Sequence, residues 1–290
     1  MKDFAGKVAV VTGAGSGFGR EFARIGAQLG MKLSLADIQP EALAATVDEL
    51  RGQGAQVIGE TVDVSRSADV ERLAQRTLDA YGAVHLLFNN AGVASGGLVW
   101  ENSVKDWEWV LGVNLWGVIH GVRTFVPIML AQGDECHVVN TASVAGLLSP
   151  QLMGVYNVSK HGVVTLTETL YQDLRVTGAR IGVSLLCPAF VPTGIAQSHR
   201  NRPPSMRDEA APTASMIAAQ KASEKAVSSG RVSAGEVAQM TFDAIRENRF
   251  YVITHPKILA SVELRLQDVI AQRNPSDPFS LEPGVAPQPR

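Results

Sequence analysis

Near its start the chain reads Lys7-Val8-Ala9-Val10-Val11-Thr12-Gly13-Ala14-Gly15-Ser16-Gly17-Phe18-Gly19. The valine-rich run shows no polar alternation, which is typical of a parallel strand buried on both faces. It passes directly into closely spaced glycines. Apolar residues then recur at the spacing of one helix face, at Phe18, Phe22, Ile25 and Leu29, and Gly30 marks the end of that helix. The pattern predicts a strand, a glycine-rich turn and a helix.

The glycine-rich turn is suited to binding the phosphates of a dinucleotide. Glycines let the backbone approach a pyrophosphate, and the following helix offers free N–H groups and the positive end of its dipole. A glycine repeat is a weak signal alone and a strong one between a strand and a helix. We therefore assign cofactor contacts to Gly13, Gly15, Ser16, Gly17, Phe18 and Gly19.

The second predicted strand ends in Asp37, 18 residues after Gly19. An acid at about this distance hydrogen-bonds the ribose hydroxyls of NAD and repels a 2′-phosphate. The neighbouring Ile38 and the turn residues Ala14 and Ser16 carry no positive charge that would attract such a phosphate. The sequence therefore predicts NAD as the cofactor. Capping of the next helix is a second role for Asp37, and the two are compatible.

Strands and helices alternate along the rest of the chain. This rhythm predicts an α/β fold, a single-domain Rossmann-type doubly wound parallel sheet with helices on both faces. The expected strands are 7–11, 32–36, 55–62, 84–88, 137–141, 181–186 and 250–254, and the expected later helices are 40–53, 66–81, 100–131, 153–178 and 234–247.

Ligands bind at the carboxyl ends of the strands in such sheets. Asp63 at one strand end is placed to meet the adenine edge, with capping of its own turn as the alternative. We assign the other residues at strand ends to the same site: Val64, Asn90, Ala91, Gly92, Ser143, Pro188, Val191 and Thr193.

Ser143 and the segment from Tyr156 to Lys160 supply groups for proton transfer. Residues four apart share one helix face, so the phenol and the ammonium lie side by side. An unperturbed tyrosine, with a pKa of about 10, is a poor base, and a nearby positive charge lowers that pKa. The Ser143 hydroxyl can hydrogen-bond the oxygen of an alcohol or carbonyl. Because a Tyr-x-x-x-Lys pattern also arises by chance, its weight comes from the other motifs of the chain.

Composition excludes several classes of function. The 290 residues are 46% hydrophobic and 19% charged, with a net charge of −2, so nothing favours a nucleic acid or an anionic membrane as partner. Cys136 and Cys187 lie in apolar segments without metal-ligand spacing, so we expect buried free thiols and no metal site. The start lacks the apolar run of a signal peptide, and no stretch of about 20 apolar residues is evident, so we expect a cytoplasmic protein.

Residues 190–232 interrupt the alternation with polar residues and prolines. A long irregular insertion beside a ligand-binding edge is typical of a substrate lid, with a disordered surface loop as the alternative. We expect residues 1–255 to form the dinucleotide-binding and catalytic domain. Residues 256–290 then form a C-terminal helix and a proline-rich tail that is a strap or disordered. Apolar residues in the lid and beside Ser143 favour a bulky, apolar substrate: Met206, Met216, Ile217, Leu147, Leu148, Leu152 and Met153.

In combination, the motifs resemble those of the short-chain dehydrogenase/reductase family. The resemblance spans roughly residues 5–255 and rests on Thr12-Gly-x-x-x-Gly-x-Gly19, Asn89-Asn-Ala-Gly92, Ser143 and Tyr156-x-x-x-Lys160, in family order, with Asn114 completing a catalytic tetrad. Two positions depart from the family pattern. Ala189 follows Pro188 where glycine is common, and Phe18 replaces an aliphatic residue.

The resemblance implies a role for each member of the tetrad. Tyr156 is the general acid/base, and Ser143 orients the substrate oxygen. Lys160 lowers the pKa of the tyrosine and binds the nicotinamide ribose. Asn114 holds a water in a proton relay.

The resemblance also implies hydride transfer between NAD and a secondary alcohol or ketone, and we favour alicyclic, aromatic or steroid-like substrates. One alternative is an NADPH-dependent ketoreductase of acyl or carrier-bound substrates, against which Asp37 argues. Another is a non-catalytic nucleotide sensor, a class that usually lacks the tyrosine or the lysine. Family members are often homotetramers or dimers built on the helices that are here 100–131 and 153–178. The tryptophans of the first helix, Trp100, Trp107, Trp109 and Trp116, are consistent with such an interface.

Overall fold

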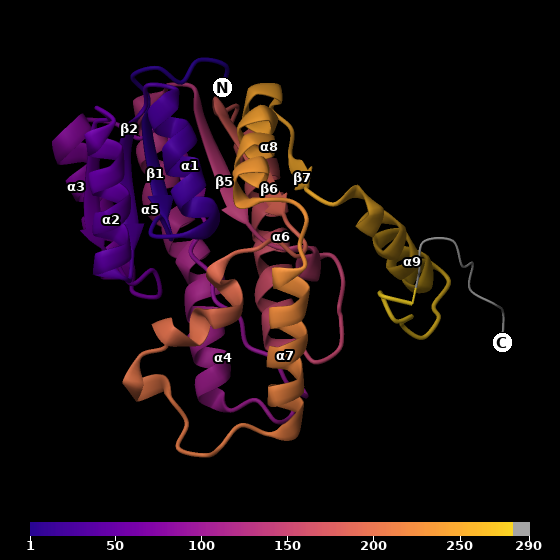
Figure 1. Ribbon diagram of the computed structural model, residues 1–290. Coiled ribbons are helices and arrows are strands. Elements are labelled where there is room, and N and C mark those ends of the chain that lie inside the picture. The colour runs from indigo at the N-terminus through magenta and orange to yellow at the C-terminus, as the bar shows by residue number, and fades with distance from the viewer. Residues whose placement is uncertain (281–290) are drawn as a thin grey trace.

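The computed structural model describes residues 1–280, whose seven strands form one sheet in the order β3-β2-β1-β4-β5-β6-β7 (Figure 1). Every neighbouring pair is parallel. The order reverses between β1 and β4, which opens a crevice at the carboxyl ends of the strands. The predicted doubly wound sheet is confirmed. Its strands are β1 (Val8–Thr12), β2 (Lys32–Asp37), β3 (Val57–Thr61), β4 (Leu86–Asn89), β5 (Cys136–Thr141), β6 (Ile181–Cys187) and β7 (Tyr251–Ile253).

Helices cover both faces of the sheet, and each face has its own apolar core. α1 (Gly17–Gln28), α2 (Pro40–Gly52) and α8 (Ala234–Glu247) pack on one face. α3 (Ser67–Tyr81), α5 (Gly117–Gln132) and α6 (Gly154–Val176) pack on the other. The strands between them are buried on both sides, because side chains of successive residues point to opposite faces. This explains the continuous valine-rich run of β1, in which every residue is buried.

The predicted helix 100–131 is three segments: α4 (Val104–Leu111), a π-helical turn at Gly112–Trp116, and α5. By length and composition Val104–Gln132 could cross a membrane, a test that core helices also pass, and in this fold it packs beside the sheet. Its tryptophans do not form one stripe. Trp109 is 6% exposed, whereas Trp100 and Trp116 are 76% and 51% exposed.

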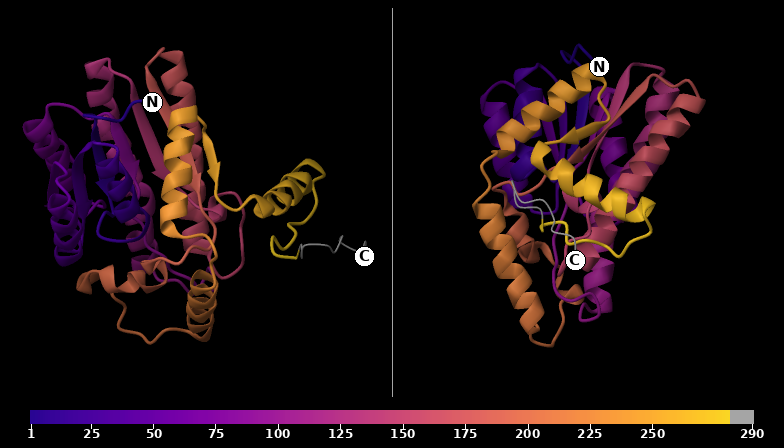
Figure 2. Two further views of the ribbon diagram at one scale, coloured as in Figure 1. Left: turned by 45° about the horizontal axis from the view of Figure 1, so that its top comes forward. Right: turned by 90° about the vertical axis from the view of Figure 1, so that its right-hand side faces the viewer.

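The insertion at 190–232 is more regular than the predicted irregular lid. It contains 3-10 helices η3 (Gly194–Asn201) and η4 (Pro204–Met206), followed by α7 (Ala214–Ser228). These segments lie beyond the carboxyl edge of the sheet, next to α4 (Figures 1 and 2). The sequence does not reveal α7 because few of its residues are buried, so its apolar stripe is weak.

The predicted C-terminal helix is confirmed as η5 (Pro256–Ile258) and α9 (Leu259–Ile270), and α9 projects away from the sheet (Figures 1 and 2). The tail begins by folding back on this helix, since the Ser276 amide donates to Asp268 over 2.9 Å. The remainder of the predicted tail, residues 281–290, lies outside the described residues.

Candidate active site

A cavity of about 680 Å³ lies at the carboxyl ends of the strands, within the range of small-molecule and cofactor sites. It brings together residues from the carboxyl ends of six of the seven predicted strands. Among the predicted site residues, its lining contains Gly13, Ser16, Gly17, Phe18, Asp37, Asp63, Val64, Asn90, Ala91, Gly92, Ser143, Tyr156, Lys160, Pro188, Val191 and Thr193. Gly15, Gly19 and Asn114 lie outside the lining, and the cofactor contacts assigned to the two glycines stay a prediction.

The glycine-rich turn requires glycine because its own backbone packs closely against neighbouring backbone, in addition to the approach of a phosphate. Gly13 has φ +69°, and a Cβ there would lie 2.9 Å from the Ala91 Cα. A Cβ on Gly19 would lie only 2.1 Å from the Gly13 carbonyl oxygen. Gly19 therefore lets α1 begin directly against the turn, so its role is in the shape of the site.

Thr12, at the end of β1, joins the turn to the segment after β4. Its hydroxyl accepts hydrogen bonds from the amides of Asn90 (2.9 Å) and Ala91 (3.1 Å) and donates to the Phe88 carbonyl (3.2 Å). The Asn90 side chain donates to the Thr12 carbonyl over 3.0 Å. Thr12 was not predicted as a functional residue. Its position at a strand end, directly before the glycines, could have indicated this role from the sequence.

Asp37 retains capacity for a ligand, which allows the fit of NAD to be tested. The Gly15 and Gln39 amides each donate to one of its carboxylate oxygens, over 2.8 and 2.9 Å. A carboxylate has about four acceptor positions, so both oxygens can still accept from ribose hydroxyls. The first turn of α1, with Gly17 and Phe18 in the cavity lining, presents the positive dipole end. These residues fit a dinucleotide.

Asp63 both lines the cavity and caps its own turn. Its Oδ1 accepts from the Ser65 amide (3.0 Å) and the Ser65 hydroxyl (2.6 Å). The capping role that the sequence left open is therefore present, and contact with an adenine stays a prediction.

Ser143, Tyr156 and Lys160 meet at the inner part of the cavity. The Lys160 Nζ lies 5.7 Å from the centroid of the Tyr156 ring and donates to the Thr141 carbonyl over 3.0 Å. The Ser143 hydroxyl accepts from the Ala145 amide (3.1 Å) and donates weakly to the Pro188 carbonyl (3.3 Å). The predicted side-by-side placement of the phenol and the ammonium is confirmed.

Burial controls the charge of this pair. It raises the pKa of Tyr156 above its ordinary value, and the Ser143 hydrogen bond opposes that rise. It also lowers the pKa of Lys160 to about 8. The expectation of a lowered tyrosine pKa is therefore wrong for this arrangement, because desolvation of the phenolate outweighs the opposing effect of the Ser143 hydroxyl on the pKa of Tyr156. With a pKa of about 8, Lys160 is still mostly protonated at neutral pH and can donate hydrogen bonds.

Asn114 is fully buried in the π-helical turn. Its amide group donates to the Val93 carbonyl (2.9 Å) and the Ser159 hydroxyl (3.0 Å), and its oxygen accepts from the Val93 amide (2.8 Å). The side chain thus fixes the segment after β4 against α6. A role in a water relay stays a prediction.

The apolar wall of the cavity differs from the predicted one. Met206 lines the cavity, whereas Met216, Ile217, Leu147, Leu148, Leu152 and Met153 lie outside the lining. Trp109 and Val113 of the α4 region line it and were not predicted. Their contribution depends on how the lid docks beside α4, which the sequence pattern does not encode.

The cysteines and the acidic side chains form no second centre in the described part of the chain. Cys136 and Cys187 are free and buried, as predicted. Within residues 1–280, no group of three or more His, Cys, Asp or Glu side chains is placed to hold a metal ion.

Comparison with known proteins places this geometry in a family. The sequence profile described as short chain dehydrogenase matches residues 7–204. A CLA biosynthesis dehydrogenase/reductase of Lactiplantibacillus plantarum is 33% identical, covering 95% of this chain and 97% of that protein. A cyclohexanol dehydrogenase of Acinetobacter sp. (strain SE19) is 35% identical, covering 66% of this chain and 75% of that protein.

The fold comparison agrees with the sequence comparison. The crystal structure of a short chain dehydrogenase/reductase from Burkholderia phymatum, in complex with NAD, has 62% sequence identity and a TM-score of 0.95. The match covers 97% of this chain and 100% of that chain. The chain therefore belongs to the short-chain dehydrogenase/reductase family.

Proposed function

We propose that the protein is an NAD-dependent oxidoreductase that interconverts apolar, fairly bulky secondary alcohols and ketones. The observation that carries the proposal is the presence of Ser143, Tyr156 and Lys160 in one cavity with the glycine-rich turn and Asp37. The similarity to a protein solved with NAD supports the cofactor. Cyclohexanol is an alicyclic secondary alcohol, so the similarity to a cyclohexanol dehydrogenase supports the substrate class.

The roles of the residues follow from their chemistry. Bound NAD supplies the hydride acceptor for alcohol oxidation, and its reduced form supplies the donor for the reverse direction. Tyr156 takes the hydroxyl proton from the alcohol, or returns it to the ketone oxygen. The Ser143 hydroxyl exchanges its weak bond to Pro188 for one to the substrate oxygen, where it stabilises developing negative charge. The Lys160 ammonium stabilises the phenolate and hydrogen-bonds the ribose.

We propose that residues 190–232 act as the lid of this site. Three polar contacts support a closed position over the cavity. The Ser198 hydroxyl accepts from the Ala94 amide (2.8 Å), and the Ser215 hydroxyl accepts from the Leu98 amide (2.9 Å). The Gln39 side chain donates to Asn201 (2.5 Å), beside the cofactor acid Asp37. Exchange of substrate and product then requires these contacts to break.

The proposal includes a homo-oligomer that uses the α5 and α6 surface. Trp116, which directly precedes α5, and Val158 on α6 are about half exposed, at 51% and 48%. Apolar side chains of this kind are enriched in subunit interfaces. Light scattering of the purified protein tests this part, because a monomer at micromolar concentration would contradict it.

The central test is NAD reduction, followed by the absorbance of the reduced nicotinamide, with a panel of secondary alcohols. The variant Tyr156→Phe is expected to lose about 100-fold or more in kcat, the usual contribution of a general acid/base. Tyr171→Phe is the matched control, because Tyr171 lies on the same helix and packs against Phe250. Equal activity of the two variants would refute the role of Tyr156.

Cofactor choice is tested by comparing NAD with NADP in the same assay. We expect a preference for NAD that weakens in Asp37→Ser, because the carboxylate repels a 2′-phosphate. A wild-type preference for NADP would instead favour the NADPH-dependent ketoreductase of acyl or carrier-bound substrates.

A further inference from the structure

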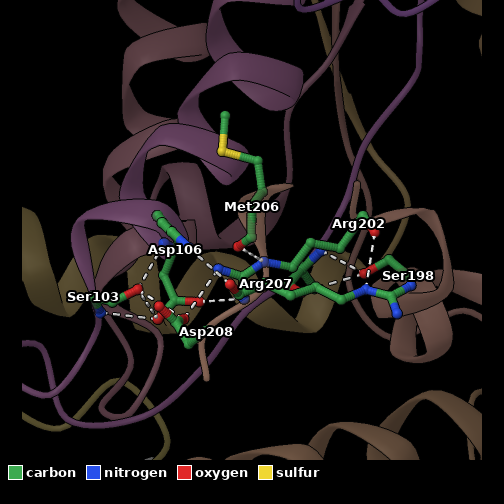
Figure 3. A network of polar contacts seen from close by, with 9 residues as sticks. Ser103, Asp106, Ser198, Arg202, Met206, Arg207 and Asp208 are labelled. Carbon is green, nitrogen blue, oxygen red and sulfur yellow. Dashed lines mark hydrogen bonds and ion pairs between the residues drawn. The ribbon is translucent and has the colours of Figure 1, made fainter. Parts of the chain in front are cut away.

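Arg202 is the centre of a polar network that joins the lid to α4 (Figure 3). One guanidinium nitrogen lies 2.6 Å from Asp106 Oδ1, and another lies 3.3 Å from Asp208 Oδ2. Its Nε donates to the Met206 carbonyl over 2.7 Å. The Arg202 and Asp106 side chains are only 15% and 5% exposed, so the contact between them is shielded from competing water, whereas Asp208 is 33% exposed.

Asp106 holds its end of the network rigidly, because it also caps α4. Its Oδ2 accepts from the Ser103 amide (2.9 Å), and its own amide donates to the Ser103 hydroxyl (3.1 Å). The Asp106 side chain is 5% exposed. A carboxylate fixed in a capping box cannot shift without disturbing the first turn of the helix. Asp106 thus holds the Arg202 guanidinium at a fixed position relative to α4.

The same guanidinium reaches the cavity through two neighbours. It lies over the ring of Trp109, with 5.3 Å between the guanidinium carbon and the ring centroid. Trp109 and Met206 both line the cavity, whereas Arg202 lies outside the lining. In Figure 3 the Met206 side chain points away from the network that holds its carbonyl. Arg202 therefore acts on the cavity only through the residues it positions.

The segment from Ser198 to Met206 is short and conformationally restricted. Ser198, four residues before Arg202, is 3% exposed and bonded to the backbone of Ala94. Pro203 and Pro204 follow Arg202 and restrict the backbone up to Met206. With one end fixed at Ser198, the contacts of Arg202 hold Met206 relative to α4, and the contacts of Lys105 with Arg207 and of Ser103 with Asp208 hold the residues that follow.

We propose that Arg202 is a positioning residue that holds Trp109 and Met206 as an apolar wall of the substrate cavity, and that it thereby sets the preference for bulky alcohols. The inference rests on the proposed function. The indole and the thioether carry no acid/base group that would serve the reaction. A substrate contacts them through carbon atoms beyond the reacting oxygen, so the wall distinguishes substrates by size.

Arginine suits this position better than lysine. Its planar fork donates in several directions at once and stacks on an aromatic ring, whereas an ammonium is a compact charge. Arg202→Lys keeps the charge beside Asp106 and removes the fork. It is therefore the informative substitution. Lys105→Met is the matched control, because the Lys105 ammonium also links α4 to the lid, through the Arg207 carbonyl (2.9 Å), and lies outside the cavity lining.

The experiment measures kcat and KM with NAD for cyclohexanol and for 2-propanol, together with the Kd for NAD by fluorescence titration. For Arg202→Lys we expect the KM for cyclohexanol to rise about tenfold, the effect of a lost methylene-sized contact. We expect a smaller loss for 2-propanol, little change in kcat and an unaltered Kd for NAD. Lys105→Met is expected to follow the wild type with both alcohols.

Several outcomes would overturn the inference. One is an equal rise in KM for cyclohexanol and 2-propanol in Arg202→Lys, and another is a fall in kcat with KM unchanged. A third is a selective rise in the KM for cyclohexanol in Lys105→Met. Each would indicate a general effect of lid anchoring. Binding of cyclohexanone in the presence of NAD, followed by tryptophan fluorescence, separates this inference from the proposed function. A wild type that binds the ketone and turns over no alcohol refutes the proposed function, and Arg202 is then judged by the tenfold loss of ketone affinity.

Discussion

Lys160→Met tests whether burial sets the charge of the catalytic pair. Lys160 is 3% exposed, and its pKa falls from an ordinary value of 10.5 to about 8 because the ammonium is desolvated. The side chain of methionine has a similar length and no charge. The substitution therefore removes a buried ammonium while it keeps most of the packing, and it is expected to abolish turnover.

The size and sign of the stability effect follow from proton linkage. Below pH 8 both the folded and the unfolded chain carry the Lys160 proton, and the burial of the charge costs about 3 kcal/mol, taking 1.36 kcal/mol for each pH unit between the two pKa values. Between pH 8 and pH 10.5 the unfolded chain binds a proton that the folded chain has released, so the free energy of unfolding rises with pH. Above pH 10.5 the cost has vanished.

The loss of the hydrogen bond to the Thr141 carbonyl gives Lys160→Met an offset that varies little with pH, so the slope is diagnostic. From pH 7 to pH 10, the free energy of unfolding of the wild type should rise relative to that of Lys160→Met by about 2.5 kcal/mol. Urea unfolding followed by tryptophan fluorescence at several pH values measures this difference. Lys221→Met, at an exposed position on α7, is the control and should parallel the wild type. Parallel curves for Lys160→Met and the wild type would refute the reasoning, because they would show that water reaches the ammonium.

Three further substitutions test how the site is built. Gly19→Ala places a methyl group against the Gly13 carbonyl, so we expect a fall in Tm and loss of NAD binding by calorimetry; a variant with normal Tm and Kd would contradict the close approach. Asn114→Leu leaves the buried amide and carbonyl of Val93 unpaired, and we expect the free energy of unfolding to fall by about 3 kcal/mol or more in urea titrations. Glu101→Gln weakens the hydrogen bonds at the start of α7, so amide exchange measured by mass spectrometry should accelerate there and stay unchanged in β5.

The sheet and the cofactor end of the cavity were predictable because their signals are local. The run of β1 and the turn from Gly13 to Gly19 occupy a dozen consecutive residues, and the same chain segment forms both the strand and the ligand loop. Asp37 follows from one further strand. Since parallel strands place all their carboxyl ends at one edge, residues at predicted strand ends meet without any knowledge of side-chain packing.

The substrate end was less predictable because its contacts join distant segments. Trp109 and Met206 line the same cavity although they lie almost 100 residues apart. Arg202 connects them directly, with its guanidinium over the indole ring and its Nε bonded to the Met206 carbonyl. The π-helical turn that buries Asn114 likewise follows from tertiary packing. Helical periodicity cannot distinguish it from the α-helices on either side.

The pair of Tyr156 and Lys160 shows most clearly the difference between what residue spacing predicts and what only the burial of side chains decides. A spacing of four residues fixes which side chains are neighbours, so the contact between Tyr156 and Lys160 was predicted and is confirmed. The direction of a pKa shift depends on how much water the surrounding chain excludes, which no spacing reports. Here Lys160 is buried and Tyr156 is partly buried, and desolvation disfavours the phenolate and the ammonium alike. Tyr156 must be a phenolate before it can accept the proton of an alcohol. Because burial disfavours the phenolate, its stability depends on partners in addition to Lys160. The Ser143 hydroxyl opposes the rise in the pKa of Tyr156, and it can donate to the phenolate once its proton leaves the Pro188 carbonyl.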